Sequence, residues 1–430
     1  MAMGWPRFHA PTWYEDRIEP RRFPPIDAGR SVEIAVIGAG LAGLSTAFSL
    51  LERGHRDVVV LEAGQPGEGA SGRNGGFVFG GYSLGPDALV RRVGPDQART
   101  MQRWTHDAVD RVRKRCAALG VALDGEGVLL ADWFRDREGL ARLRDAMART
   151  TGLELVSLDR AQREDWVRSD RYGGGLLEPR AFHFNPLAYA RALAGELDAC
   201  GIAVHGDTPV DGIERAGDGW RIGTVHGDMH AGRVVVATGG YDRRLVPRLV
   251  RSIHPIGTYV AVTEPLPGRL EELIPGTAAV YDTRFAFDYY RRIGDRLLWG
   301  GRISIADREP GAIEALMRRD MIRVFPSLAD ASFTHSWGGW MSYARHQMPI
   351  LGELEPGLWA ASAFGGHGMA PTTLAGEVIA EALDGERDRL AAFGPWPTRW
   401  AGGRIGRWAA QASYWWYQAR DAAHAWRSGG

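Results

Sequence analysis

The sequence predicts an α/β fold of mixed α+β character, in which a mostly parallel sheet is interleaved with an antiparallel one. Three observations lead to this prediction. An apolar run at 32–37 ends in a glycine-rich turn and a helix-forming segment. A second apolar run at 233–237, far along the chain, also ends in a glycine turn. Residues 253–263 and 278–305 alternate between apolar and polar side chains, which is typical of antiparallel strands.

The first glycine turn has the spacing of a dinucleotide-binding loop. Gly38 permits a tight turn, Gly40 lets a pyrophosphate approach the backbone, and Gly43 allows close packing of helix on strand. The N-terminus of the following helix offers N–H groups and partial positive charge to phosphates. Glu62 ends the next strand, 58–61, where an acid would hydrogen-bond a ribose hydroxyl. This Rossmann-like unit predicts contacts from Gly38, Ala39, Gly40, Leu41, Ala42, Gly43, Glu62 and Ala63.

The remaining elements follow from periodicity and capping signals. The glycine-rich stretch 64–81 is incompatible with a regular helix or strand. Asn185 followed by Pro186 predicts the start of a helix that ends near Cys200. We expect further helices at 86–119, 136–150, 372–383 and 406–426, and strands at 128–130, 202–205, 208–214, 219–225, 233–237 and 358–363.

The distance between the strands that feed glycine turns predicts a discontinuous nucleotide-binding domain. A simple dehydrogenase completes such a domain in one block, whereas these strands lie near the start, middle and end of the chain. We expect an N-terminal arm at 1–30, a nucleotide-binding domain at 31–119, 183–245 and 336–390, a substrate domain at 120–182 and 246–335, and a helical tail at 391–430.

Composition narrows the class of protein. Of the 430 residues, 45% are hydrophobic and the formal net charge is zero, which gives no electrostatic case for nucleic acid or an anionic membrane. The N-terminus lacks a signal-peptide pattern and no apolar run reaches the roughly 20 residues of a membrane span, so we expect a cytoplasmic protein.

Cys116 and Cys200 are too few for a metal site and are expected to be buried and reduced. Lys114, the only lysine, lies in an arginine-rich helix face, which argues against Schiff-base chemistry.

Four motifs together resemble those of the FAD-dependent amine and amino acid oxidases, the superfamily of glycine oxidase, D-amino acid oxidase and sarcosine oxidase. They occupy 37–40, 69–76, 237–240 and 366–369. The arm with Trp13 and Tyr14, the unbroken Ser-Gly-Arg-Asn-Gly-Gly and the aromatic tail are similar to the gamma-glutamylputrescine oxidase-like branch. The resemblance implies a Rossmann-like FAD-binding domain interleaved with an antiparallel-sheet substrate domain.

The resemblance also implies that FAD is the cofactor. The N–H groups at 365–368 precede a helix and would face the flavin pyrimidine ring, where negative charge builds at N1 and O2 on reduction. Related enzymes attach FAD through a cysteine in a region that aligns with 338–342, and this chain has none there, so we expect noncovalent FAD. The further implied contacts are Ser71, Gly72, Arg73, Asn74, Gly75, Gly76, Val210, Thr238, Gly239, Gly366, His367, Gly368 and Met369.

The activity that the resemblance implies is oxidation of a C–N bond. A neutral amine gives a hydride to flavin N5, the imine hydrolyses, and O2 or another acceptor takes the electrons. The lysine that activates oxygen in sarcosine oxidase has no counterpart at 297–301, and the carboxylate-binding arginine of glycine oxidase has none near Met341. The candidates for catalysis or substrate contact are His367, Tyr259, Tyr289, Tyr290, Arg291 and Arg302.

Several questions stay open at the level of sequence. The substrate could be a polyamine derivative, a secondary amine or an amino acid, and the oligomeric state is undetermined. A flavin monooxygenase and a flavin-binding subunit that needs a partner for turnover are the alternatives to an amine oxidase. The tail carries six tryptophans, which would suit docking on the protein's own body, a dimer or partner surface, or a membrane-surface helix. Its small residues favour docking.

Overall fold

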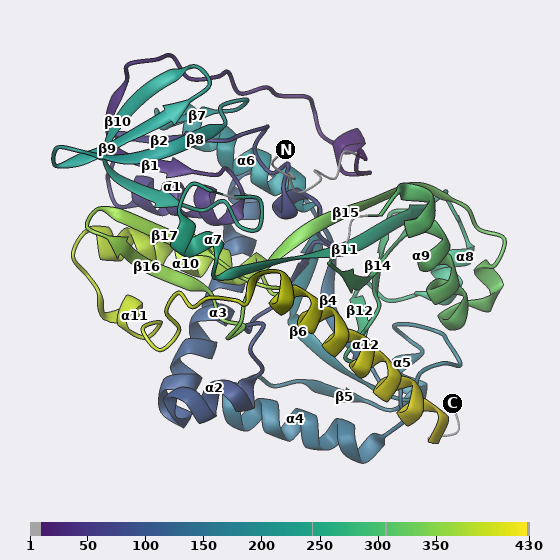
Figure 1. Cartoon of the computed structure of the whole chain (residues 1–430). Coiled ribbons are helices and arrows are strands. Elements are labelled where there is room, and N and C mark those ends of the chain that lie inside the picture. The colour runs from purple at the N-terminus through teal and green to yellow at the C-terminus, as the bar shows by residue number, and fades with distance from the viewer. Residues whose placement is uncertain (1–9, 243, 306–307, 428–430) are drawn as a thin grey trace.

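The computed structural model describes residues 10–242, 244–305 and 308–427, and the part of the predicted arm before Ala10 lies outside this description. In the described chain there are two sheets, an eight-stranded sheet A and a nine-stranded sheet B (Figure 1). The mixed α/β class predicted from the sequence is confirmed.

Sheet A contains the strands that feed the predicted glycine turns. Its path runs β16-β17-β10-β1-β2-β7, and β10 also pairs with β9, which pairs with β8. Pairing is parallel from β17 to β7, whereas β16, β9 and β8 are antiparallel additions. The strands are β1 (Ser31–Ile37), β2 (Val58–Leu61), β7 (Ala203–His205), β8 (Val210–Ala216), β9 (Gly219–Thr224), β10 (Gly227–Val236), β16 (Ile350–Glu355) and β17 (Leu358–Ser362).

The apolar run of β1 is continuous because both faces of this central strand are buried. Ile34 and Val36 pack into a core with helices, while Ala35 and Ile37 pack into a second core on the opposite face. A Cβ at Gly376 would overlap the main chain of Ser45, so glycine there lets α1 and α10 cross closely. The helices around sheet A are α1 (Leu41–Glu52), α2 (Pro86–Val93), α3 (Pro95–Ala118), α6 (Pro186–Ala199), α7 (Pro247–Val250), α10 (Met369–Leu383) and α11 (Asp388–Ala391).

Sheet B is largely antiparallel, with one parallel pair between β12 and β4. Its path runs β15-β11-β14-β13-β12-β4-β6-β3, with β5 beside β6. The strands are β3 (Phe77–Val78), β4 (Leu123–Ala131), β5 (Val156–Leu158), β6 (Gly175–Phe184), β11 (Ile253–Thr263), β12 (Ala279–Asp282), β13 (Tyr289–Ile293), β14 (Arg296–Ser304) and β15 (Phe333–Ala344). The accompanying helices are α4 (Arg137–Thr151), α5 (Arg160–Arg163), α8 (Arg269–Leu273) and α9 (Pro310–Val324).

The two faces of sheet B bury different sets of side chains. The outer face carries Tyr259 and Trp299, which share a core with α9. The inner face carries Val128 and Ala279, on which Phe79 and other aromatic side chains pack. This distinction matters because a side chain on one face cannot serve a site on the other.

Residues 336–344, which we assigned to the nucleotide-binding domain, pair within sheet B. This segment forms most of β15, which pairs with β11 along nearly the full length of that strand. Gly338 and Gly339 lie opposite Tyr259 and Thr258 within the strand, so they continue the strand and do not form a turn.

The tail forms one long helix, α12 (Gly403–Arg427), that docks on the protein's own body as expected (Figure 1). The docking side is partly polar and partly apolar. Gln411 accepts a hydrogen bond from Ile305 N (3.0 Å), and Asp421 accepts one from Ala286 N (3.2 Å). Tyr414 is buried, and Ala425 packs against the outer core of sheet B. Four tryptophans face away and are 55–83% exposed, namely Trp408, Trp415, Trp416 and Trp426. Among the described helices, none has the length and apolar character needed to cross a membrane.

The described part of the arm packs against both sheets. Tyr14, Phe23 and Ile26 are buried, so the arm is ordered in this region. Cys116 is buried as predicted, but the prediction for Cys200 is wrong, because it follows the last turn of α6 and is exposed.

Candidate active site

Four loops meet at the carboxyl edge of sheet A. They follow β1, β2, β10 and β17 and contain residues 38–43, Glu62, residues 238–239 and residues 365–368. In open α/β sheets, ligands bind at this edge, where the strand order changes direction. The structure therefore brings the predicted dinucleotide motifs together from distant parts of the chain.

The three glycines of the first loop have the geometry that their predicted roles require. Gly38 has a φ of +106°, and a Cβ there would lie 2.8 Å from the Ala237 carbonyl oxygen. A Cβ at Gly43 would overlap the Gly38 carbonyl, so only glycine allows α1 to pack this closely. A Cβ at Gly40 would lie 2.9 Å from Ser71 Oγ. The loop thus brings bare backbone up to the edge of the sheet.

Glu62 holds the glycine loop from the neighbouring strand. Its two carboxylate oxygens accept hydrogen bonds from Ala39 N (2.7 Å) and Gly64 N (3.1 Å). Burial raises the pKa of Glu62, and these backbone N–H groups oppose the rise. A carboxylate retains further lone pairs when it has accepted two hydrogen bonds, so this geometry leaves capacity for a ribose hydroxyl.

Both helices that begin at this edge start without an acidic residue in the first turn. The caps of α1 and α10 are Gly40 and Gly368, which have no side chain to cap the helix. Ser71 Oγ accepts from Leu41 N at the start of α1 (2.8 Å). Two helix dipoles therefore present positive ends to the same region, which suits an anion.

The predicted roles of Arg73 and Asn74 as donors to a ligand need correction. Arg73 is buried and donates to the carbonyl oxygens of Gly338 (2.7 Å) and Ala10 (2.6 Å). Asn74 Nδ2 donates to the carbonyls of residues 70 and 71, and its Oδ1 accepts from Gly76 N. Both side chains shape the loop, because their groups bond to the protein's own backbone.

Three successive carbonyl groups of this loop are each held by a buried side chain. Trp337 Nε1 donates to the carbonyl of Arg73 (2.9 Å), and Tyr14 Oη donates to that of Asn74 (2.9 Å). Arg291 Nε donates to that of Gly75 (2.6 Å). These side chains come from β15, the arm and β13, so the loop connects both sheets and the arm.

Arg291, predicted as a substrate contact, is instead a fully buried structural residue. Besides Gly75, its guanidinium donates to Asp124 (2.5 Å), to Phe184 O (2.8 Å) and to Nδ1 of His183 (3.1 Å). Arg291 also donates to Tyr14 Oη (3.2 Å). An arginine has five N–H donors, and these five partners occupy them from within the protein. The hydrogen-bonding capacity of Arg291 is therefore taken up by the protein itself rather than left for a substrate.

Three further substrate predictions are corrected by the alternation of the strands. Tyr259 and Tyr290 are fully buried on the outer face, and Tyr290 stacks on Trp299 with ring centroids 4.6 Å apart. Arg302 forms a two-pronged ion pair with Asp320 of α9, with both N–O distances 2.6 Å. These side chains stabilise sheet B from its far side.

Tyr289 and His367 do lie on the inner side, within a group of aromatic rings. His367 contacts Phe79 edge-on, with centroids 4.9 Å apart, and Tyr289 contacts Phe77 at 5.4 Å. Phe79 stacks on Tyr281 at 6.0 Å. Burial lowers the pKa of His367 to about 4, which keeps the imidazole neutral at neutral pH. Our sequence reasoning missed Phe77 and Phe79, although they directly follow the Gly75-Gly76 motif.

Ser83 is a second residue that our sequence reasoning missed. Its Oγ accepts from Gly366 N (3.0 Å) and His367 N (3.3 Å) and donates to the carbonyl of Phe364 (3.1 Å). Two N–H groups expected to face a flavin ring thus bond to a serine in the structure. No local sequence signal pairs Ser83 with a turn so distant in the chain.

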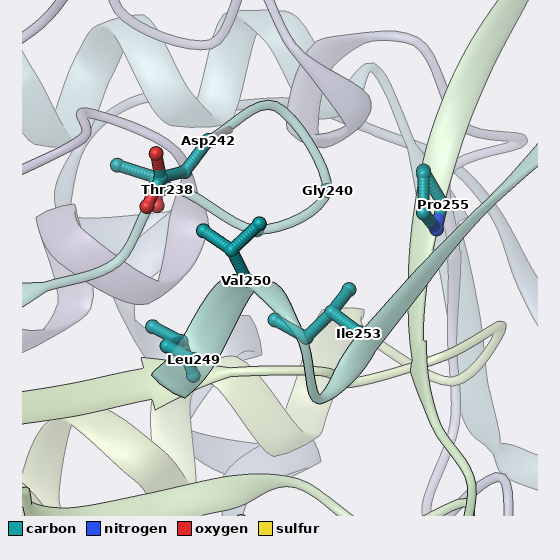
Figure 2. Close-up of a pocket in the computed structure, with 8 residues that line it drawn as sticks. Thr238, Gly240, Asp242, Leu249, Val250, Ile253 and Pro255 are labelled. Atoms are coloured by element: carbon teal, nitrogen blue, oxygen red, sulfur yellow. The ribbon is translucent and has the colours of Figure 1, made fainter. Parts of the chain in front are cut away.

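The loop after β10 borders a small hollow (Figure 2). Thr238 and Asp242 lie side by side above Leu249 and Val250 of α7. Among the described residues, Thr238 Oγ1 and Asp242 Oδ2 are buried without a hydrogen-bond partner. The predicted contact Val210 begins β8, opposite Thr224, and is partly exposed.

The sheet order, the glycine loop and the two helix N-termini define a dinucleotide-binding oxidoreductase of α/β type. The chain belongs to the DAO family of FAD dependent oxidoreductases, whose model matches residues 33–382. Its cofactor is FAD, bound noncovalently as is typical of the family, and its members are enzymes that act on CH–NH donors of amines and amino acids.

The sequence comparisons agree with the branch that the motifs indicated. The chain is 33% identical to the gamma-glutamylputrescine oxidoreductase of Escherichia coli over 382 residues, which cover 87% of this chain and 89% of the relative. It is 30% identical to the probable oxidoreductase OrdL of Haemophilus influenzae over 391 residues, with 89% of each chain covered.

Solved structures share the fold at lower identity. The glycine oxidase of Bacillus cereus superposes with a TM-score of 0.70 at 19% identity, covering 84% of this chain and 97% of that one. The L-proline dehydrogenase of P. horikoshii superposes with a TM-score of 0.73, also at 19% identity, covering 87% and 99%. These likenesses confirm the architecture.

The residues at the carboxyl edge of sheet A fit FAD. The bare backbone at Gly38 and Gly40 and the acid-free first turn of α1 suit a pyrophosphate. Glu62 follows the adjacent strand, where a ribose would lie. The buried, unpartnered hydroxyl of Thr238 is a polar group for which the described residues supply no bond.

Proposed function

We propose that the protein oxidises the C–N bond of an amine and passes the electrons to O2, giving H2O2. The main support for this proposal is the cluster of aromatic side chains on the inner face of sheet B. This cluster contacts the start of α10 through Phe79 and His367. The name of the Escherichia coli relative supports an amine derived from putrescine as one candidate substrate. A secondary amine and an amino acid are the other candidates.

We assign the cofactor-holding role to the loops at the edge of sheet A. Residues 38–43 would hold the pyrophosphate and Glu62 the ribose, while residues 71–76 and 366–369 would border the flavin half. When bound, FAD supplies a hydride acceptor for the carbon that carries the amine. Val210, Thr238 and Gly239 would border the adenosine half.

The chain's own residues bind the substrate, exclude water and surround the reacting amine with apolar side chains. Phe77, Phe79, Tyr281 and Tyr289 form an apolar wall, which favours the neutral form of the reacting amine. His367 stays neutral at neutral pH because its pKa is lowered to about 4, so it adds no positive charge beside that amine. The reaction needs no dedicated protein base.

An anaerobic titration of flavin absorbance tests the proposal. Bleaching by an amine without NADPH supports it, whereas bleaching only by NADPH would establish the monooxygenase alternative. Absence of bleaching by either, restored by a partner protein, would establish the subunit alternative. Stoichiometric H2O2 from a peroxidase-coupled assay in air tests the oxygen step, and turnover only with an artificial acceptor would replace oxidase by dehydrogenase.

A further inference from the structure

A buried carboxyl group, Glu178, lies on the inner face of sheet B. It stands in β6 directly opposite Val128 of β4, which in turn pairs with Ala279 of β12. Residues directly opposite on neighbouring strands project from the same face. Val128 and Ala279 are core residues of the inner face, whereas the adjacent Leu177 belongs to the outer core. The alternation therefore places Glu178 with the aromatic rings.

The Glu178 carboxyl group is unusually short of partners. Its side chain is 8% exposed, and among the described residues Oε1 has no hydrogen-bond partner. Burial raises the pKa of Glu178 to about 7, opposed by the backbone N–H of Gly80 and the positive charge of Arg180. An acid in this setting costs stability unless something pairs with it.

The rings next to Glu178 suit a cation. Phe79 and Tyr281 are stacked at 6.0 Å, and Phe287 contacts Tyr281 edge-on at 5.6 Å. Burial raises the pKa of Tyr281, and the charge of Glu178 adds to the rise, which reflects their proximity. Aromatic faces carry partial negative charge and attract ammonium groups, most strongly when water is excluded.

The nearby arginines do not provide a receptor for a substrate carboxylate. Arg291 is occupied by Gly75, Asp124 and other partners, and Arg180, whose charge acts on Glu178, is paired with Asp110. Arg73 donates to two backbone carbonyls. The inner face thus presents an acid and aromatic rings, a combination that attracts cations and repels the carboxylate of an α-amino acid.

We propose that Glu178, together with Phe79, Tyr281 and Phe287, binds an ammonium group of the substrate other than the reacting amine. The substrate is then a diamine or polyamine derivative and not an α-amino acid; this inference rests on the amine oxidation proposed above. The reacting amine cannot be the partner of Glu178, because a carboxylate stabilises the charged form whereas the reaction needs the neutral one.

A pair of isosteric amines tests the assignment on the holoenzyme. In 1,4-diaminobutane a second ammonium replaces the terminal methyl group of pentylamine. For wild type, we expect the diamine to reduce the flavin with an apparent Kd at least tenfold below that of pentylamine. Glu178→Gln should raise the Kd for the diamine about tenfold to a hundredfold, the loss expected for a charge-assisted hydrogen bond. It should leave the Kd for pentylamine and the limiting reduction rate unchanged.

The matched control is Glu126→Gln, in β4 close to Val128 but with a side chain 54% exposed and paired with Arg113. It should change neither Kd. Thermal melting separates binding from folding, because Glu178→Gln removes an unpartnered buried acid and should keep or raise the melting temperature.

Two outcomes would overturn the inference. Equal affinity of wild type for both amines, or an equal effect of Glu178→Gln on the two Kd values, would mean that Glu178 does not bind the second ammonium. An α-amino acid as the best reductant would also refute it, while amine oxidation as such would stand. If no amine or amino acid reduced the flavin of wild type, the proposed function itself would fail, and the inference with it.

Discussion

Replacing Arg291 with methionine should both destabilise the protein and weaken its hold on FAD. The guanidinium is fully buried and bonds to the carbonyls of Gly75 and Phe184, to Asp124 and to His183. Methionine fills most of the volume of the side chain but satisfies none of these acceptors. The variant therefore removes the hydrogen bonds of Arg291 while keeping most of its packing volume.

The magnitude follows from the partners left behind. Removing one member of a buried ion pair costs about 3–5 kcal/mol, because the other charge stays buried without compensation. Asp124 keeps about a third of its exposure, so the lower end of that range applies to the pair. Each unpaired carbonyl adds about 1–3 kcal/mol when counted alone. Since such terms do not add in full, we expect a loss of about 4 kcal/mol in the free energy of unfolding.

The effect on FAD comes through the loop at 71–76. Gly75 loses the bond that positions its carbonyl, and the following Gly76 sits at a φ of +77° against the Phe184 carbonyl. We expect the Kd for FAD to rise at least tenfold, about 1.4 kcal/mol. Urea unfolding of the apoprotein and FAD titration of the folded apoprotein measure the two effects separately.

Arg302→Met is the matched control, because it breaks an equally close pair with the buried Asp320 on the outer face. It should lower the stability comparably and leave the Kd for FAD unchanged. If both variants weaken FAD binding to the same extent, the loss reflects general destabilisation, and the argument that Arg291 holds the flavin loop is refuted.

Three other predictions follow from single features of the structure. Glu62→Gln should weaken FAD binding by about 1.5–3 kcal/mol while the reduction rate at saturating FAD stays the same; loss of rate with intact affinity would exclude a ribose contact. Burial and the charge of Arg291 lower the pKa of His183 to about 3. Below pH 6.5 His183 is therefore protonated in the unfolded chain and stays neutral in the folded one. The contribution of His183 to the free energy of unfolding should be fully present above pH 6.5 and fall by about 2 kcal/mol at pH 5. In urea melts, His183→Asn should remove this part of the dependence of stability on pH. Truncation after residue 394 should lower the melting temperature by several degrees, whereas Trp408→Ser and Trp415→Ser, which alter exposed side chains, should each change stability by less than about 0.5 kcal/mol; similar losses in all three would mean that the outward tryptophans are packed.

The nucleotide-binding half was predictable because its physics is local. The spacing of Gly38, Gly40 and Gly43 reports a turn and a close helix contact, both of which appear in the structure. The cap of α6 was equally readable, since Asn185 accepts from the N–H groups of residues 187 and 188. Such features depend on neighbours within a few residues and leave a pattern in the sequence.

The substrate face was not predictable in the same way. Tyr289 and Tyr290 are adjacent and chemically identical, yet strand alternation places one on the inner face and buries the other against Trp299. Arginine is a residue type that often contacts substrates, but the partners of Arg291 come from three segments of the chain that only the fold brings together. Glu178 left no pattern, because a single acid after two leucines gives no sign of which face it will occupy.

The loop at 71–76 explains how the two sheets could act as one site. Its backbone carbonyls are bonded by Trp337 from β15, Tyr14 from the arm and Arg291 from β13, while its N-terminal Ser71 bonds to the start of α1. The loop therefore transmits the position of sheet B to the edge of sheet A through short, buried bonds. Because these bonds are intramolecular, the loop is preorganised for a ligand rather than shaped by it. The strand after the loop, β3, carries Phe77 on the same inner face as Glu178, so a rigid loop would hold the flavin half and the substrate wall at a constant separation.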